Sequence, residues 1–365
     1  MQPSTKNLNL CKTGMALALF AVGTGAYAQA TATNTPTGNA IAFATGGGGG
    51  TSPLTATLAA VVSGPAAALA GSTGVSINTF TAAAAYPGST SLAGAPRRFA
   101  LFGQKGEAAA GGGQAWNAWF NVAQNNVGYS FAPVNASGRV NSGTVGVDYT
   151  FSNKVILGLA LSGDQTRIGL NGSTVTGNMS GRGNTSTLYV GVPINQNWTF
   201  DGGLGLGRTK VDLSLNNLTG SLNSNRSIGN LGLTYRQGMG NWLLSGRGSF
   251  TSVNDKLGAF TLSNGTLVTD ASVTIQQLRF GGRAAYNAGS VTPYIGLTYV
   301  YDVKAPGAIT LGGQTSAADR DAFNLQLGLG FRTSGSIYGN IQYSTEQSRK
   351  EVKNNQLMFN LGVRF

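Results

Sequence analysis

Side chains able to do covalent chemistry are scarce in this sequence. Its 365 residues include no histidine and one cysteine, Cys11. Without histidine, Ser-His-Asp catalysis has no general base. Asp319 and Asp321, in "SAADRDA", could hold Ca²⁺, but no third spaced carboxylate lies nearby, which favours solvated loop charges. We therefore predict no catalytic residue, no metal site, no cofactor and no enzymatic activity.

Two further signals have ordinary explanations. "GGLGLGR" (202–208) imitates a phosphate-binding loop, but its glycines alternate along a strand instead of opening a helix. The net charge of +12 comes from 24 Lys and Arg against 12 Asp and Glu. The strand pattern and export signal of this chain predict an exported barrel, whose positions would account for most of this charge, so we expect no nucleic acid among the partners.

Several arginines alternate with apolar residues, which places them on the opposite face of a strand. In "IQQLRFGGRAAY" (275–286), for example, two arginines oppose Leu278 and Phe280. An arginine facing lipid near mid-membrane costs about 2–4 kcal/mol, so these side chains should face a wet interior. The arginines assigned to this interior are Arg247, Arg279, Arg283, Arg332 and Arg364.

Two interpretations of the interior arginines stay open. They could line an anion-selective pore. Alternatively, they pair with inward-facing acids such as Asp148 and Asp201, or brace a plug, and this second interpretation is favoured.

The elements that would position these side chains are segments of about ten residues with alternating apolarity, long enough to span a bilayer as tilted β-strands. An even number of antiparallel strands can close into a barrel that satisfies every backbone group in lipid. The prediction is therefore an all-β, twelve-stranded antiparallel transmembrane β-barrel. The predicted strands are 114–123, 139–150, 154–163, 183–192, 197–208, 226–236, 241–250, 275–286, 291–301, 322–332, 335–344 and 356–365.

Connection lengths support a membrane barrel over a soluble sandwich. Every second connection, such as "PINQ" (193–196) or "NAGS" (287–290), has two to four residues, whereas the others have 11 to 24 polar residues. Tight periplasmic turns and long external loops are typical of transmembrane barrels. Aromatic residues beside the short turns should form the periplasmic girdle.

The final stretch, "QLMFNLGVRF" (356–365), alternates to its last residue. Its apolar row, which should face lipid, comprises Leu357, Phe359, Leu361, Val363 and Phe365.

The N-terminal part differs in character. Residues 1–28 have a basic start, a short apolar core and "AYA", as in a secretory signal peptide. Residues 29–97 are rich in Ala, Gly, Thr and Ser, contain no acid, and are interpreted as a short passenger or linker. Residues 98–113 are a linker with a possible pore-plugging helix, and 114–365 form the barrel.

Twelve C-terminal strands, the terminal aromatic and the exported N-terminal segment resemble an autotransporter of type V secretion. "GTVGVDYTF" with "KVILGLALSG" (143–163) also looks like the second hairpin of that family's translocator domain. The resemblance covers residues 98–365. It implies that the barrel-assembly machinery recognises Phe365, with Val363, Leu361 and Phe359, and that periplasmic chaperones escort the chain.

The resemblance further implies an outer-membrane barrel that anchors or translocates the short N-terminal passenger to the cell surface. The passenger is much shorter than is usual in the family and lacks β-solenoid repeats. Expected partners are the lipid bilayer and lipopolysaccharide, with the protein acting as a monomeric barrel. The alternatives are a passive outer-membrane pore for small solutes and a surface adhesin acting through its long external loops.

Overall fold

The computed structural model describes the C-terminal two-thirds of the chain. The predicted signal peptide (1–28), passenger (29–97) and plug (98–113) lie outside the described residues, as does Phe365. The described ranges are 115–130, 135–173, 176–268, 270–304, 310–311, 314–315, 320–333 and 337–364.

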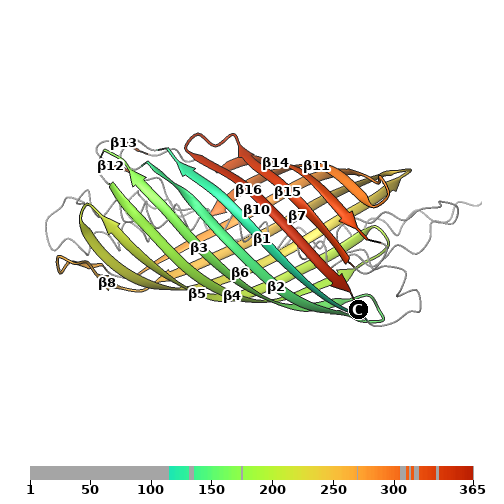
Figure 1. Ribbon diagram of the computed structural model, residues 1–365, viewed down its shortest axis with the longest axis horizontal. Helices are drawn as coiled ribbons and strands as arrows, with labels where there is room; N and C mark the ends of the chain where they lie inside the picture. Colours follow the sequence, from blue (N-terminus) through green and yellow to red (C-terminus); the bar gives the residue numbers. More distant parts are fainter. Residues whose placement is uncertain are drawn as a thin grey trace, which may run out of the picture. The chain divides into compact units, whose positions relative to one another are not determined.

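Twelve antiparallel strands close into a barrel, which confirms the predicted fold class. The first strand, β1, pairs with the last, β16, and the two lie side by side in Figure 1. The other strands pair with their neighbours along the chain, in the order β1-β16-β15-β14-β11-β10-β7-β6-β5-β4-β3-β2. The barrel strands are β1 (Ala115–Tyr129), β2 (Ala136–Thr150), β3 (Ile156–Asn171), β4 (Thr176–Pro193), β5 (Trp198–Leu215), β6 (Leu218–Met239), β7 (Trp242–Leu257), β10 (Ala271–Tyr286), β11 (Val291–Lys304), β14 (Asp321–Arg332), β15 (Ile337–Gln347) and β16 (Val352–Arg364).

Two small hairpins lie in the connections at one end. They are formed by β8 (Phe260–Thr261) with β9 (Leu267–Val268), and by β12 (Thr310–Leu311) with β13 (Gln314–Thr315). Among the described residues, no helix is long and apolar enough to cross a membrane.

Most strands are longer than predicted, so the predicted length of the long connections is wrong. The expected loop 209–225 is instead the extended ends of β5 and β6, joined by a tight turn at Asn216–Asn217. Both asparagines have positive φ, 47° and 68°. This left-handed conformation suits a two-residue hairpin turn, and asparagine tolerates it better than most residues.

The extensions escaped prediction because the apolar row changes face along the strand. On β5, Leu204 and Leu206 point outward with 73% and 72% of their surface exposed, whereas Asp201 points inward and is fully buried. Beyond Leu206 the outward residues become polar, and the inward ones become apolar. An outward apolar surface suits lipid, and an outward polar surface suits water. The switch therefore marks one edge of the apolar belt.

Beyond this edge the interior holds an ordinary water-excluding core. The hairpin β8-β9 folds onto β6, where the Ser263 amide donates to the Thr219 carbonyl at 2.8 Å. The predicted external loop 251–274 thus shrinks, because its two ends belong to β7 and β10. The buried members of this core are Ile168, Leu170, Met179, Leu213, Leu215, Leu222 and Leu262.

The opposite end carries the short turns, as predicted. Aromatic pairs flank them on neighbouring strands: Trp198 with Tyr235, at 5.0 Å between ring centroids, and Trp242 with Tyr286, at 5.1 Å. All four rings are exposed, as an interfacial girdle requires. β1 begins and β16 ends at this same end, since Asn117 lies directly opposite Arg364.

Candidate functional site in the barrel interior

The interior row of the barrel is polar where the outer row is apolar. On β1, Asn117, Asn121 and Asn125 are buried, while Phe120 and Val122 between them are exposed. Buried amides require hydrogen-bond partners, and Asn121 donates to Asn360 of β16 at 2.7 Å. A bore at membrane depth is therefore lined with hydrogen-bonding groups.

Arg247 of β7 faces this interior and pairs with Asp201 of β5. Its Nη1 and Nη2 lie 2.5 and 2.7 Å from the two carboxylate oxygens, and Nη1 also donates to Thr234 Oγ1 at 2.8 Å. Two parallel charge-assisted bonds hold both groups in one geometry. From the sequence we expected interior arginines to pair with acids such as Asp148 and Asp201, without assigning partners.

The carboxylate of Asp148 on β2 accepts hydrogen bonds from uncharged side chains. Asn117 Nδ2 donates to Asp148 Oδ2 at 2.9 Å, and the Tyr189 hydroxyl donates to the same oxygen at 3.0 Å. Trp119 Nε1 in turn donates to the Tyr189 hydroxyl at 2.8 Å. Strands β1, β2 and β4 are thereby joined through their side chains.

Arg279 and Arg283 both lie on the inward row of β10, with Gly281 between them. Arg279 donates to Gln277 Oε1 at 2.7 Å. Arg283 donates to Gln326 Oε1 at 3.0 Å, and its guanidinium carbon lies 4.4 Å from the ring centroid of Tyr294. Such stacking on an aromatic face stabilises a desolvated cation.

A further charged cluster connects β11 and β15 inside the barrel. Arg349, in the connection after β15, donates to Asp302 Oδ2 at 2.7 Å and pairs with Glu346. Burial lowers the pKa of Arg349, but its hydrogen bonds to Asp302 and Glu346 and their charges outweigh this and raise that pKa above its ordinary value. The guanidinium stays charged and ties β15 to β11.

The sequence prediction missed a triad centred on Arg226. Arg226 of β6 makes two bonds to Asp255 of β7, at 2.8 and 3.0 Å, and reaches Asp164 of β3 at 3.4 Å. Arg226 shares the inward row of Asn230 and Thr234, and strand alternation could have revealed it. Asp255 could not be found, because the expected loop 251–274 contained it.

The last two predicted interior arginines lie at the short-turn end. Arg332 ends β14, with its backbone amide donating to the Ser290 carbonyl at 2.9 Å. The backbone of Arg364 pairs with β1, opposite Asn117.

The closing strand β16 places three of the predicted assembly residues, Phe359, Leu361 and Val363, on its outward row with Leu357. Leu357 and Val363 are exposed, while Gln356 and Met358 of the other row are buried. The Phe359 ring lies 5.8 Å from that of Phe120 on β1 and 6.4 Å from that of Phe331 on β14. Leu361 lies directly opposite Phe120. These apolar contacts cover the seam where the barrel closes.

A closed twelve-stranded sheet with an apolar outer belt and a polar bore defines an outer-membrane β-barrel. A family model, the autotransporter beta-domain, matches residues 110–344. The chain belongs to this family, and its barrel is an autotransporter translocator barrel of the outer membrane.

Solved translocator domains share the fold. The translocator domain of NalP from Neisseria meningitidis matches with a TM-score of 0.58 at 15% identity, covering 71% of this chain and 93% of that one. The beta domain of the Bordetella autotransporter BrkA gives 0.54 at 14% identity, covering 68% and 99%. The transport unit of AIDA-I from Escherichia coli gives 0.55 at 11% identity, covering 68% and 90%. No curated protein matches the sequence.

Proposed function

We propose that the barrel carries residues 29–97 to the cell surface and anchors them there. One observation carries this proposal: β1 starts at the short-turn end of the barrel, where Ala115 lies directly opposite Thr150, the last residue before the β2-β3 turn. Short turns face the periplasm in outer-membrane barrels. A segment attached there reaches the outside by passing through the bore.

The chemistry of the bore supports passage of a polypeptide. Buried Asn, Gln, Thr and charged side chains line it, and these groups can exchange hydrogen bonds with a backbone in transit. Residues 29–97 carry no acid and few bulky side chains. Such a segment has a small cross-section, and because it has no carboxylates it should not bind tightly to the interior arginines.

We further propose that residues 1–28 are removed as a signal peptide, that 98–113 rest inside the bore, and that one chain forms the working unit. Closure of the sheet within a single chain supports the last statement. Assembly would depend on the machinery that inserts barrels, with Phe365 as the terminal signal. Deleting Phe365 should reduce the folded, membrane-inserted fraction, measured as heat-modifiable migration on gels.

An epitope tag placed after Asn39, followed by protease treatment of intact cells, tests surface display. We expect the tag to be removed while the barrel stays folded. A tag at Gly265, in the β8-β9 hairpin, is the accessible control, and a tag at Asn195, in the β4-β5 turn, is the protected control. An Asn39 tag as protected as the Asn195 tag would refute display.

The passive pore stays a second candidate because the bore is polar. The arrangement of its charges disfavours it: Arg247, Arg226 and Arg349 are each tied to carboxylates instead of presenting a ring of free charge to permeating ions. The adhesin alternative required long external loops as its binding surface. The structure disfavours it, because the predicted long loops are largely strand extensions.

A further inference from the structure

Five basic side chains point outward just beyond the apolar belt on four neighbouring strands. All five are exposed, and they lie on the outward rows of β2, β3, β4 and β5. We name them the basic patch: Arg139, Arg167, Arg182, Arg208 and Lys210.

The strand register sets these cations beside one another. Arg139 lies directly opposite Arg167, and Arg182 lies directly opposite Lys210. Like charges in directly opposed positions of a sheet destabilise it. Two such pairs on neighbouring strands would be stabilised by an anion bound from outside the protein, because it would reduce the repulsion between the cations.

The protein itself supplies little compensation. Asp212 is the only acid on the outward rows of β2 to β5, and its Oδ1 lies 3.8 Å from Lys210 Nζ with both side chains well exposed. Asp164, close along the chain to Arg167, points inward to Arg226. Five cations and one acid leave four positive charges on this face.

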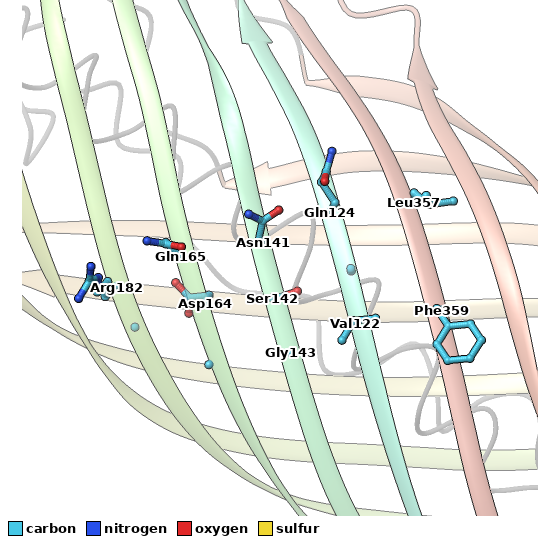
Figure 2. A pocket seen from close by; sticks show the side chains of 13 residues that line it. Val122, Gln124, Asn141, Ser142, Gly143, Asp164, Gln165, Arg182, Leu357 and Phe359 are labelled. Atoms are coloured by element: carbon cyan, nitrogen blue, oxygen red, sulfur yellow. The ribbon is translucent and has the colours of Figure 1, made fainter.

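A row of polar side chains, here called the polar shelf, continues the basic patch across the neighbouring strands. From Lys210 and Arg182 it passes to Gln165, then Asn141, then Gln124, each directly opposite the next. Figure 2 shows Arg182, Gln165, Asn141 and Gln124 in sequence across β4, β3, β2 and β1. Cations and amides thus form one continuous row across four neighbouring strands of the barrel wall.

A groove of about 820 Å³ opens along this shelf. It exists because Gly143 and Gly163 have no side chains on the outer row, and a Cβ at Gly143 would meet no atom within 4 Å. Its other end is apolar, with Leu357 and Phe359 of β16 (Figure 2). A polar edge joined to an apolar floor fits an amphiphile.

We propose that this surface binds the phosphorylated headgroup of an outer-leaflet glycolipid, a lipopolysaccharide. The phosphates lie against the basic patch, and the acyl chains lie over the exposed leucines immediately below it, Leu161, Leu204 and Leu206. Charge complementarity and the adjoining apolar belt select a lipid over a soluble anion. The proposal rests on the outer-membrane location and is independent of passenger transport.

The test uses the full chain folded in detergent micelles and native mass spectrometry of bound lipid. Lipid A with two phosphates should bind more tightly than dephosphorylated lipid A. The paired variants R139Q/R167Q and R182Q/K210Q should each weaken binding of the phosphorylated form by up to about thirtyfold, from the attraction of about 1 kcal/mol expected for each of the two basic residues near an anionic surface. Heat-modifiable migration shows that every variant is folded.

K304Q is the matched control, since Lys304 is exposed at the end of β11, on the other side of the barrel. K154N removes a cation from the short-turn end. Both should bind lipid A as the wild type does. Equal binding of both lipids, an equal loss in the controls, or full displacement by inorganic phosphate would each overturn the proposal.

Discussion

Arg247 of β7 and Asp201 of β5 form a two-bond ion pair across β6, the strand that separates theirs. Gly232 of β6 makes this possible, because a Cβ there would lie 2.1 Å from Arg247 Nη2. The carboxylate is fully buried. Three strands of the wall are thereby fixed relative to one another from inside the bore.

Replacing Asp201 with Asn should destabilise the barrel by about 3 kcal/mol, because a largely buried guanidinium loses its counter-charge. The measurement is the free energy of unfolding in urea, from lipid vesicles. The double variant Asp201→Asn/Arg247→Gln should lose less than Asp201→Asn alone, since no unpaired charge remains. A double variant at least as destabilised as the single one would show that the ion pair is not the cause.

Replacing Leu204 with Arg should destabilise the folded barrel by about 2–4 kcal/mol, because its outward side chain would meet hydrocarbon. Urea unfolding from vesicles again measures the change. The control is Ser214→Arg, on the outward row of the same strand but beyond the edge of the belt. Its unfolding free energy should hardly change. Similar losses at both positions would place the edge of the lipid elsewhere.

Replacing Gly158 with Val should cost about 1–3 kcal/mol, as overpacking does. A Cβ at Gly158 would lie 2.2 Å from Cζ of Tyr189 on the neighbouring strand. The tyrosine must move, and the bonds from Trp119 to Tyr189 and from Tyr189 to Asp148 would break. The midpoint of urea unfolding reports the loss. Gly143→Ala, into open space, should leave the midpoint unchanged.

Removing residues 98–113 should raise single-channel conductance in planar bilayers. The proposed occupant of the bore would be gone, and water and small ions could then enter the polar bore. The full chain should conduct little. Steady conductance from the full chain, unchanged by the deletion, would instead support the passive pore.

The sequence predicts the membrane-spanning part of this fold well, because a strand in lipid must alternate. Leu204 and Leu206 outward with Asp201 inward follow from period two alone. The same rule places Arg247, Arg279 and Arg283 on the inward rows.

Alternation alone does not predict the strand ends beyond the lipid or the pairing of side chains inside the barrel. Beyond the lipid the apolar row changes face, so Leu213 and Leu215 escaped notice as strand residues with an inward core. The partners of Arg226 come from β3 and β7, and their meeting depends on the tilt and register of the closed sheet. The sequence suggested that interior arginines pair with acids such as Asp148 and Asp201, but alternation does not say which arginine meets which acid.

Photo-crosslinking most directly tests the central claim that the N-terminal segment passes through the bore, with residues 98–113 remaining inside it. A photoreactive residue at Ser162, on the inward row of β3, is compared in assembled cells with one at Leu161, on the outward row. Mass spectrometry should find crosslinks from position 162 to peptides within residues 98–113, and none from position 161. Crosslinks to that segment from position 161 alone, or from neither position, would contradict the claim.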